Sequence, residues 1–264
     1  MNITANQIYF DCTVGSAGHA AEIARLGGEV IGLDVDPDAL KRAQAKLPNA
    51  RFVQANFSQL LKVAESLGVT QASGVLLDLG LSSNQLADVN RGFSFQTNGP
   101  LDMRLDPRLT TTAADLVNKL SEAELYQLFT DYGEEPRALA IASVIVKSRP
   151  ITTTQELAQL ISSVVRHRGR TNPATQVFQA LRIAVNQELA NLEAVLPQAV
   201  KLLKPGGRLA VISFHSLEDR IVKNFMKHNQ QLKNLTKHPL KPSREEVLTN
   251  PRSRSAKLRL GEKI

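Results

Sequence analysis

An apolar run that leads into a glycine-containing turn is the feature that most constrains the fold of this chain. Residues 8–12 (IYFDC) are followed by TVGSAGH, in which Gly15 and Gly18 lie three residues apart. A second apolar run, residues 30–34 (VIGLD), ends on Asp34. A strand, a glycine turn and a helix direct backbone N–H groups toward an anionic ligand group, and an acid at the tip of the next strand binds ribose hydroxyls. The pattern predicts a nucleoside-binding crevice at the edge of a parallel sheet.

Further apolar runs alternate with helical patterns, which is the arrangement that builds a parallel sheet. The predicted strands cover residues 8–12, 30–34, 51–55, 74–78 and 208–213. After the second strand, Asp36 precedes Pro37. An acidic N-cap followed by proline at the first helical position predicts a helix from Pro37 to Lys46. The expected fold class is therefore α/β.

The segment between the last two predicted strands is helical in pattern, with no convincing strand over residues 104–177. Capping boxes, in which a hydroxyl and a carboxylate satisfy the free N–H groups of a helix start, are predicted at Ser121 with Glu124 and at Thr153 with Glu156. The apolar faces of the predicted helices comprise residues 138–146 and Leu157, Leu160, Ile161, Val164 and Val165. We predict an inserted all-helical domain for substrate recognition over residues 104–177.

The flanking segments, residues 1–103 and 178–264, are predicted to form one discontinuous core domain. One long helix is predicted before the fifth strand, and it ends at residues 204–207 (KPGG). Its apolar side would be formed by Leu181, Val185, Leu189, Leu192 and Leu196.

Positive charge is concentrated at the end of the chain. The formal net charge is +7, and residues 220–264 hold twelve Lys or Arg against three Glu. Such a segment is either a solvated, partly disordered tail or a surface that binds a phosphate backbone. Arg166, Arg168 and Arg170 form a second basic cluster far away in the sequence, which favours a nucleic-acid partner.

Composition argues against membrane, secreted, disulfide-bonded and metal-binding proteins. No apolar run approaches the roughly 18 residues of a membrane span, and no leader-like pattern is present, so a soluble, cytoplasmic protein is expected. The single cysteine, Cys12, allows neither an internal disulfide nor a Cys-x-x-Cys metal site, and no metal is expected.

The glycine turn does not match the dinucleotide fingerprint Gly-x-Gly-x-x-Gly, because it holds only Gly15 and Gly18. The middle glycine of that fingerprint lets the backbone approach a pyrophosphate, so no pyrophosphate is expected here. A ligand with a carboxylate and an amine in place of phosphates, and still a ribose and an adenine, would fit. S-adenosylmethionine has those parts.

Residues 202–209 (LLKPGGRL) resemble the turn that leads into the fifth strand of class I methyltransferases. Together with six further blocks, this turn resembles one family, the ribosomal RNA small subunit methyltransferase H family, from residue 9 to residue 264. The six blocks are residues 80–83 (GLSS), 91–95 (RGFSF), 99–104 (GPLDMR), 178–186 (FQALRIAVN), 213–220 (SFHSLEDR) and 250–259 (NPRSRSAKLR).

The resemblance implies a class I (Rossmann-like) fold with an inserted helical domain. It also implies methyl transfer from S-adenosylmethionine to the exocyclic N4 of a cytidine in the decoding region of 16S ribosomal RNA, with the small ribosomal subunit as partner. The cofactor contacts carried over by motif are Ala17, Gly18, His19, Asp34, Phe57, Asp78 and Gln85. Phe57 can lie on the adenine face, and Asp78 can reach the adenine edge or the methionyl amine. The alternative for Phe57 is a core aromatic, and for His19 a helix cap.

The exocyclic amine of cytosine is a weak nucleophile, so acceptors for its N–H groups must position it. Asn186 and His215 are the candidate catalytic residues, and the alternative for His215 is a histidine whose hydrogen bonds are satisfied by neighbouring backbone. Carbon-5 methylation would need a thiolate, and Cys12 lies before the turn. The Pro-Pro-aromatic clamp of DNA amine methyltransferases is absent after Asp78. Candidate phosphate contacts are Lys223, Lys227, Arg252, Arg254 and Arg259, and Arg182 could pair a phosphate or support its helix.

The chain departs from the family pattern at several positions. Ser16 and Ala17 stand in a turn where an arginine and a third glycine are usual, and Asn84 replaces a customary proline before Gln85. The sequence also begins close to its first strand, where the family usually has a His-x-Pro-Val-Leu segment and a helix, and weaker closure over the cofactor is expected. The alternatives left open are a small-molecule methyltransferase, a nicotinamide-dependent oxidoreductase and a non-catalytic RNA-binding protein; a homodimer is compatible with the sequence.

Overall fold

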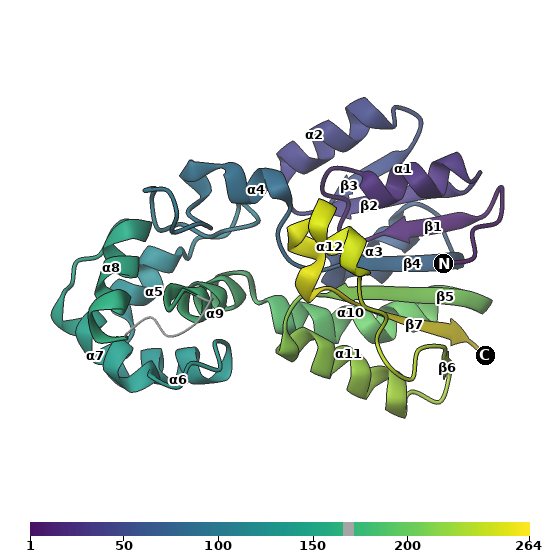
Figure 1. The fold of residues 1–264 in the computed structure, drawn as a ribbon. Helices are drawn as coiled ribbons and strands as arrows, with labels where there is room; N and C mark the ends of the chain where they lie inside the picture. The colour runs from purple at the N-terminus through teal and green to yellow at the C-terminus, as the bar shows by residue number, and fades with distance from the viewer. Residues whose placement is uncertain (166–171) are drawn as a thin grey trace. The chain divides into compact units, whose positions relative to one another are not determined.

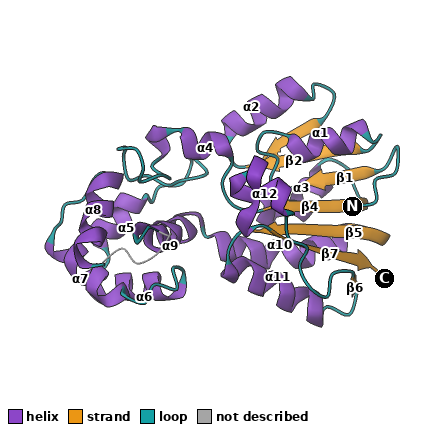
Figure 2. Ribbon diagram, in the orientation of Figure 1, coloured by secondary structure: helices purple, strands orange, loops and turns teal. Residues whose placement is uncertain are grey.

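The computed structural model describes residues 1–165 and 172–264 (Figure 1). The chain divides into two compact units, one formed by residues 1–80 and 189–264 and the other by residues 81–188. The strands are β1 (Ile8–Asp11), β2 (Glu29–Asp34), β3 (Arg51–Gln54), β4 (Ala72–Asp78), β5 (Leu203–Ser213), β6 (Leu232–Asn234) and β7 (Lys257–Lys263). All of these strands lie in the first unit (Figure 2).

The helices of the first unit are α1 (Gly18–Arg25), α2 (Pro37–Lys46), α3 (Leu60–Ser66), α10 (Glu188–Leu202), which begins at the last residue of the second unit, α11 (Ser216–His228) and α12 (Arg244–Thr249). Those of the second unit are α4 (Ser83–Ala87), α5 (Ala113–Lys119), α6 (Glu122–Asp131), α7 (Ala138–Lys147), α8 (Thr154–Val164) and α9 (Ala174–Asn186). Short 3-10 turns occur at η1 (Phe57–Gln59), η2 (Val89–Arg91) and η3 (Pro251–Ser255). Across the described part of the chain, no helix has the length and apolar character that a membrane span requires.

The seven strands form one sheet in the order β3-β2-β1-β4-β5-β7-β6. Strands β1 to β5 are parallel, and β7 is antiparallel to both β5 and β6. The strand order reverses between β1 and β4, which is the switch point where open α/β sheets bind ligands. The expected α/β fold class is confirmed.

Both faces of the sheet are covered by helices because neighbouring strand residues point to opposite sides. Tyr9 and Val30 pack with α1 and α2 in one cluster. Phe10 and Ile31 pack with α3, α10 and α11 in another. This double burial explains why the strands read as continuous apolar runs rather than as alternating ones.

The predicted strand starts and ends agree with the structure to within two residues, except at β5. This strand begins at Leu203 and includes residues 204–207, which the sequence predicted as a turn. The pairing partner of Ala72 is Leu203 and that of Gly74 is Arg208, so the KPGG segment bulges out of the ladder. Gly206 has φ +76°, a conformation that glycine adopts without strain.

Local capping chemistry was predicted correctly. Helix α2 covers Pro37–Lys46, and the Asp36 carboxylate accepts a hydrogen bond from the N–H of Asp38 at 3.0 Å. Both predicted capping boxes, at the starts of α6 and α8, are present. No strand lies between residues 104 and 165 or between 172 and 177, the described parts of the predicted insert.

The second unit has its own apolar core, built by α5 to α9 around Phe129, Ile141 and Leu181. Leu157 and Ile161 are buried, and Leu160, Val164 and Val165 pack beside them, as the helical periodicity predicted. The predicted insert, residues 104–177, lies inside this unit. Its role as a separate substrate domain stays a prediction.

The prediction of one long helix through residues 181–196 was wrong. Helix α9 ends at Asn186 and α10 begins at Glu188, because Gln187 adopts a left-handed conformation with φ +50°. A left-handed residue ends a helix, and glycine or asparagine usually occupies that place. Here glutamine occupies that place, one residue after Asn186, and the apolar spacing continues across the break, so periodicity did not mark the helix end.

The basic C-terminal segment is folded, so the alternative of a disordered tail is wrong. Strand β7 pairs with β5 from Lys257 to Glu262. Arg259, which the sequence suggested as a phosphate contact, is 4% exposed and donates from Nε and Nη2 to the Asp219 carboxylate at 2.7 and 3.2 Å. Its guanidinium therefore joins β7 to α11, whereas Lys223, Lys227, Arg252 and Arg254 are exposed.

We expect Arg259→Met to lower the free energy of unfolding by about 3 kcal/mol, because Asp219 would keep a poorly solvated charge without its main partner. Lys257, whose Nζ lies 3.3 Å from the same carboxylate, is 32% exposed. Lys257→Met should therefore lower the free energy by less than about 1 kcal/mol. Urea unfolding of the two variants measures the difference, and equal losses would contradict the assignment.

Candidate functional site

Three carboxylates lie at the carboxyl ends of neighbouring strands in the first unit. Asp11 ends β1, Asp34 ends β2 and Asp78 ends β4. Because β1 pairs with both β2 and β4, the three acids meet at the switch point of the sheet. The structure thus brings together the two acids that the sequence singled out and adds a third.

The glycine turn that follows β1 is held by hydrogen bonds to both neighbouring strand ends. The Thr13 hydroxyl accepts from the N–H of Asp78 at 2.7 Å, and the N–H of Gly15 donates to Asp34 Oδ2 at 2.9 Å. Gly15 and Ala17 both have positive φ, of 48° and 55°. A Cβ on Gly18 would meet nothing within 4 Å, so the start of α1 faces open space.

Asp34 is fixed in place by backbone donors on both of its oxygens. Oδ2 accepts from Gly15, and Oδ1 accepts from the N–H of Asp36 at 3.0 Å. Burial raises the pKa of Asp34, while these hydrogen bonds act in the opposite direction. With Val35 as a third backbone donor, one of the roughly four lone-pair sites of the carboxylate is left to accept a ligand hydroxyl.

Asp78 and His19 form a pair across the crevice. His19 Nε2 lies 3.2 Å from Asp78 Oδ2, and this hydrogen bond, with the charges of Asp78 and Asp11, raises the pKa of His19. The other oxygen, Asp78 Oδ1, is buried and has no hydrogen-bond partner among the described residues. A buried acceptor without a partner fits a ligand donor group at this place.

Asp11 is a site residue that the sequence analysis did not single out. Its side chain is 1% exposed, and burial, opposed mainly by the charge of His19, raises its pKa to about 6. The signal was available in the sequence, because Asp11 ends an apolar strand in the same way as Asp34 and Asp78.

Phe57 follows β3 in the short turn η1, whose start is capped by the Asn56 side chain. The ring is partly buried and packs against the main core of the first unit. The structure therefore agrees with the alternative interpretation of Phe57 as a core aromatic, although part of the residue is accessible to solvent.

The remaining predicted site residues have structural partners. Gln85 is 7% exposed and forms a capping box with Ser82 at the start of α4. His215 caps α11, with Nδ1 accepting from the N–H of Glu218 at 3.4 Å and Nε2 lying 3.2 Å from Glu218 Oε1. Ser-x-x-Gln is a recognisable capping signal in the sequence, whereas a histidine N-cap is not.

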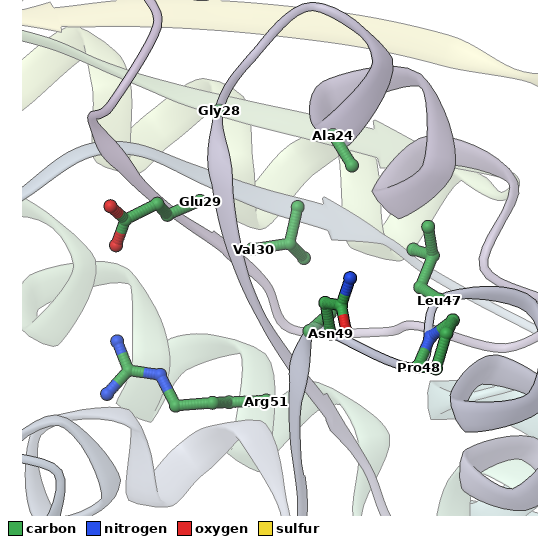
Figure 3. Close-up of a pocket in the computed structure, with 9 residues that line it drawn as sticks. Ala24, Gly28, Glu29, Val30, Leu47, Pro48, Asn49 and Arg51 are labelled. Carbon is green, nitrogen blue, oxygen red and sulfur yellow. The ribbon is translucent and has the colours of Figure 1, made fainter.

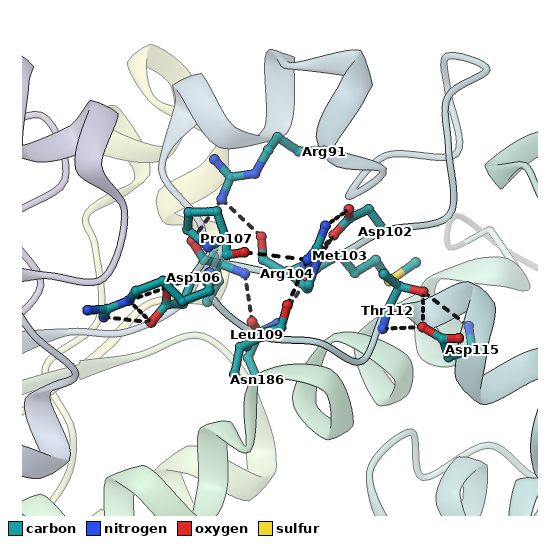
Figure 4. Close-up of polar contacts among 12 residues, drawn as sticks. Arg91, Asp102, Met103, Arg104, Asp106, Pro107, Leu109, Thr112, Asp115 and Asn186 are labelled. Atoms are coloured by element: carbon teal, nitrogen blue, oxygen red, sulfur yellow. Dashed lines mark hydrogen bonds and ion pairs between the residues drawn. The ribbon is translucent and has the colours of Figure 1, made fainter.

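Asn186 ends α9 and anchors a loop of the second unit (Figure 4). Its Nδ2 donates to the carbonyls of Met103 and Arg182 at 2.7 and 2.9 Å, and its Oδ1 accepts from the N–H of Leu105 at 2.7 Å. To accept a substrate amine as well, Asn186 would have to share this oxygen. Arg182 donates to Glu188 through two bonds of 2.8 Å, which supports the helix end.

A hollow of about 380 Å³ lies elsewhere in the first unit (Figure 3). It is lined by Glu29 and Arg51, the first residues of β2 and β3, together with Leu47, Pro48 and neighbouring residues. It therefore lies at the amino edge of these strands, opposite to the carboxylates.

Comparison with known proteins identifies the family of this chain. The sequence profile of the MraW methylase family matches residues 1–264. The chain belongs to the MraW methylase family. Ribosomal RNA small subunit methyltransferase H of Thermomicrobium roseum is 50% identical and aligns over 97% of this chain and 87% of its own length. Its counterpart in Coprothermobacter proteolyticus is 48% identical over 97% of this chain and 89% of its own.

Among solved structures, an rRNA methylase from Streptococcus thermophilus is similar to this MraW-family chain. It has a TM-score of 0.48 and 11% identity, and the match covers 99% of this chain and 89% of that one. The family resemblance inferred from the sequence blocks is confirmed by the profile and by the relatives.

We expect the stability of this methylase to fall as pH rises through the pKa of Asp11. The folded carboxyl has a pKa of about 6, above the usual value for an unfolded aspartate, so the folded state binds a proton that the unfolded state has lost. The free energy of unfolding should decrease by up to about 3 kcal/mol between pH 4 and pH 7.5 from this group. Urea unfolding across this range should show the decrease in the wild type and a smaller one in Asp11→Asn; identical slopes would contradict the assignment.

Proposed function

We propose that this chain transfers a methyl group from S-adenosylmethionine to the exocyclic N4 of a cytidine in the decoding region of 16S ribosomal RNA. The observation that carries the proposal is the group of strand ends at the β1/β4 switch point, where a two-glycine turn binds Asp34 of β2 and the end of β4, whose Asp78 Oδ1 has no partner among the described residues. Relatives that are about half identical to this chain bear the name ribosomal RNA small subunit methyltransferase H, which supports the RNA substrate.

The cofactor would be held by residues of the glycine turn and of the strand ends. The space beside the Gly18 Cα at the start of α1 is open, and N–H groups at a helix start favour a carboxylate, whereas Ala17 is fully buried and stays a contact by resemblance. Asp34 would accept the ribose hydroxyls, and Asp78 Oδ1 would accept an amine donor. His19, Phe57 and Gln85 stay cofactor contacts by resemblance. When bound, S-adenosylmethionine supplies an electrophilic methyl group on a sulfonium.

The protein's part in the reaction would be positioning rather than covalent chemistry. The crevice carries the carboxylates of Asp11, Asp34 and Asp78, which favour a cationic ligand. Asn186 and His215 were proposed as acceptors for the cytosine amine. Both side chains already have structural bonds, so their role as acceptors is a prediction, which the turnover of Asn186→Ala and His215→Ala in the methyl-transfer assay tests.

The RNA would meet exposed cations of the folded C-terminal segment. Lys223 and Lys227 lie one helical turn apart on α11, and Arg252 and Arg254 lie in η3. All four are exposed, so they can reach phosphates. The cluster of Arg166, Arg168 and Arg170 lies outside the described residues. Work on the small ribosomal subunit would place the protein in the cytoplasm.

Asp34→Asn is expected to weaken S-adenosylmethionine binding by about 10- to 100-fold, because hydrogen bonds to a charged acceptor contribute about 1.5–3 kcal/mol. Asp38→Asn is the matched control, since Asp38 lies on the exposed start of α2 and pairs with Lys41. Calorimetric titration measures both dissociation constants. If Asp38→Asn weakened S-adenosylmethionine binding as much as Asp34→Asn does, the role of Asp34 in binding the ribose would be contradicted.

Methyl transfer tests the function directly. Purified protein and labelled S-adenosylmethionine are added to small ribosomal subunits that lack the modification, and the nucleosides are analysed by mass spectrometry. N4-methylcytidine should accumulate. Cofactor binding without any gain of N4-methylcytidine would sink the proposal and favour a non-catalytic RNA-binding protein.

A further inference from the structure

Two of the sequence blocks, RGFSF and GPLDMR, have no role in the function proposed above, and the second unit brings them together with Asn186 of the FQALRIAVN block at one loop (Figure 4). We propose that residues 102–109 form a preorganised RNA contact and that Asn186 is the positioning residue that fixes it. The proposal rests on the proposed RNA substrate and names a part of the surface that would bind it.

The loop is held from two sides. Asn186 binds the carbonyl of Met103 and the N–H of Leu105, so a single carboxamide fixes both ends of the peptide segment between them. On the other side of the loop, Arg91 of the RGFSF block donates from Nη2 to the carbonyls of Arg104 and Leu105 at 3.0 and 2.9 Å. The N–H of Met103 also donates to the carbonyl of Arg91 at 3.0 Å.

The backbone inside this clamp is strained. Met103 is not a glycine, yet it has φ +63°, a conformation that costs on the order of 1 kcal/mol or more for a residue with a side chain. Its side chain is 1% exposed. At Gly92, an added Cβ would collide with the carbonyl oxygen of Pro100 and the nitrogen of Asp102. A strained conformation that several separate segments enforce is a mark of a functional loop.

The clamp leaves the tip of the loop in solvent. Pro107 and Arg108 are exposed, and the Arg108 side chain is 56% exposed. The Asp106 carboxylate holds Arg108 through Nε at 2.9 Å and Nη2 at 2.7 Å. These bonds orient the guanidinium and leave its Nη1 donors for a phosphate or a base edge. The side chain of Arg104 differs from that of Arg108, because it donates to the Leu109 carbonyl as well as to the Asp102 carboxylate and so binds within the loop.

The second unit also offers a matched control. Asn118, near the end of α5, donates to the carbonyls of Ala114 and Ile151 at 2.8 and 2.6 Å and accepts from the N–H of Ile151 at 2.9 Å. Asn186 makes the same kinds of bond, including the one to the carbonyl four residues earlier, but Asn118 anchors a different segment. If Asn186 had only a structural role, replacing it or Asn118 by alanine would change the affinity for the small ribosomal subunit equally.

The test compares Asn186→Ala with Asn118→Ala in the full-length protein. Binding to small ribosomal subunits that lack the modification is measured in the presence of S-adenosylmethionine, and amide hydrogen exchange is measured for a peptide that covers residues 103–109. We expect Asn186→Ala to raise the Kd for subunits about tenfold and to speed exchange in this peptide. Asn118→Ala should change that Kd less than twofold. Arg108→Ala should raise the Kd without changing exchange.

Asn186→Asp is a second variant in case Asn186→Ala does not fold. The aspartate keeps an acceptor for the N–H of Leu105 but loses the donors to the carbonyls of Met103 and Arg182. Equal changes of Kd in the two alanine variants, unchanged exchange at residues 103–109, or a wild type that does not bind subunits would overturn the proposal. A fall in turnover at constant Kd would make Asn186 a catalytic residue and overturn the positioning role. Wild-type protein that binds subunits but transfers no methyl group would refute the proposed function, while the Kd comparison would still decide this inference.

Discussion

The crevice of this protein depends on hydrogen bonds that join the ends of three strands through one short turn. Thr13 accepts from the backbone of Asp78, and the backbone of Gly15 donates to Asp34. These bonds fix the turn after β1 against β2 and β4 at the place where the strand order reverses. Strand pairing brings the three carboxylates together, and these bonds add to the backbone bonds that set the direction of the turn before α1.

The same arrangement concentrates negative charge in a poorly solvated place. Asp11 is buried and has a raised pKa, Asp34 is held by backbone donors, and Asp78 has one oxygen without a partner and the other beside His19. Burial of like charges disfavours their ionised forms, so the site gains from a ligand that brings positive charge or hydrogen-bond donors. A sulfonium cofactor with an amine and a ribose supplies both, which is the physical reason for the proposed function.

The predicted site residues fall into two groups for a structural reason. Asp34 and Asp78 could be predicted because an acid at the end of a buried strand has to face the edge of the sheet. Gln85 was chosen by motif resemblance, and Asn186 and His215 were chosen as possible acceptors for the cytosine amine. The structure places them in a helix cap, a loop clamp and a second helix cap, and His215 Nε2 has no hydrogen-bond partner among the described residues. A motif marks where a residue matters, but a side chain with donors and acceptors can serve the backbone as readily as a substrate.

The sequence by itself determined the α/β class, the ends of most strands and the starts of α2, α6 and α8, because apolar periodicity and capping are local properties of the chain. Tertiary structure decided the rest. The bulge of residues 204–207 and the burial of Arg259 depend on partners distant in sequence. The strained Met103 loop likewise exists only because Arg91 and Asn186, nearly a hundred residues apart, clamp it from two sides. Long-range hydrogen bonds of this kind leave no periodic signal in a single sequence.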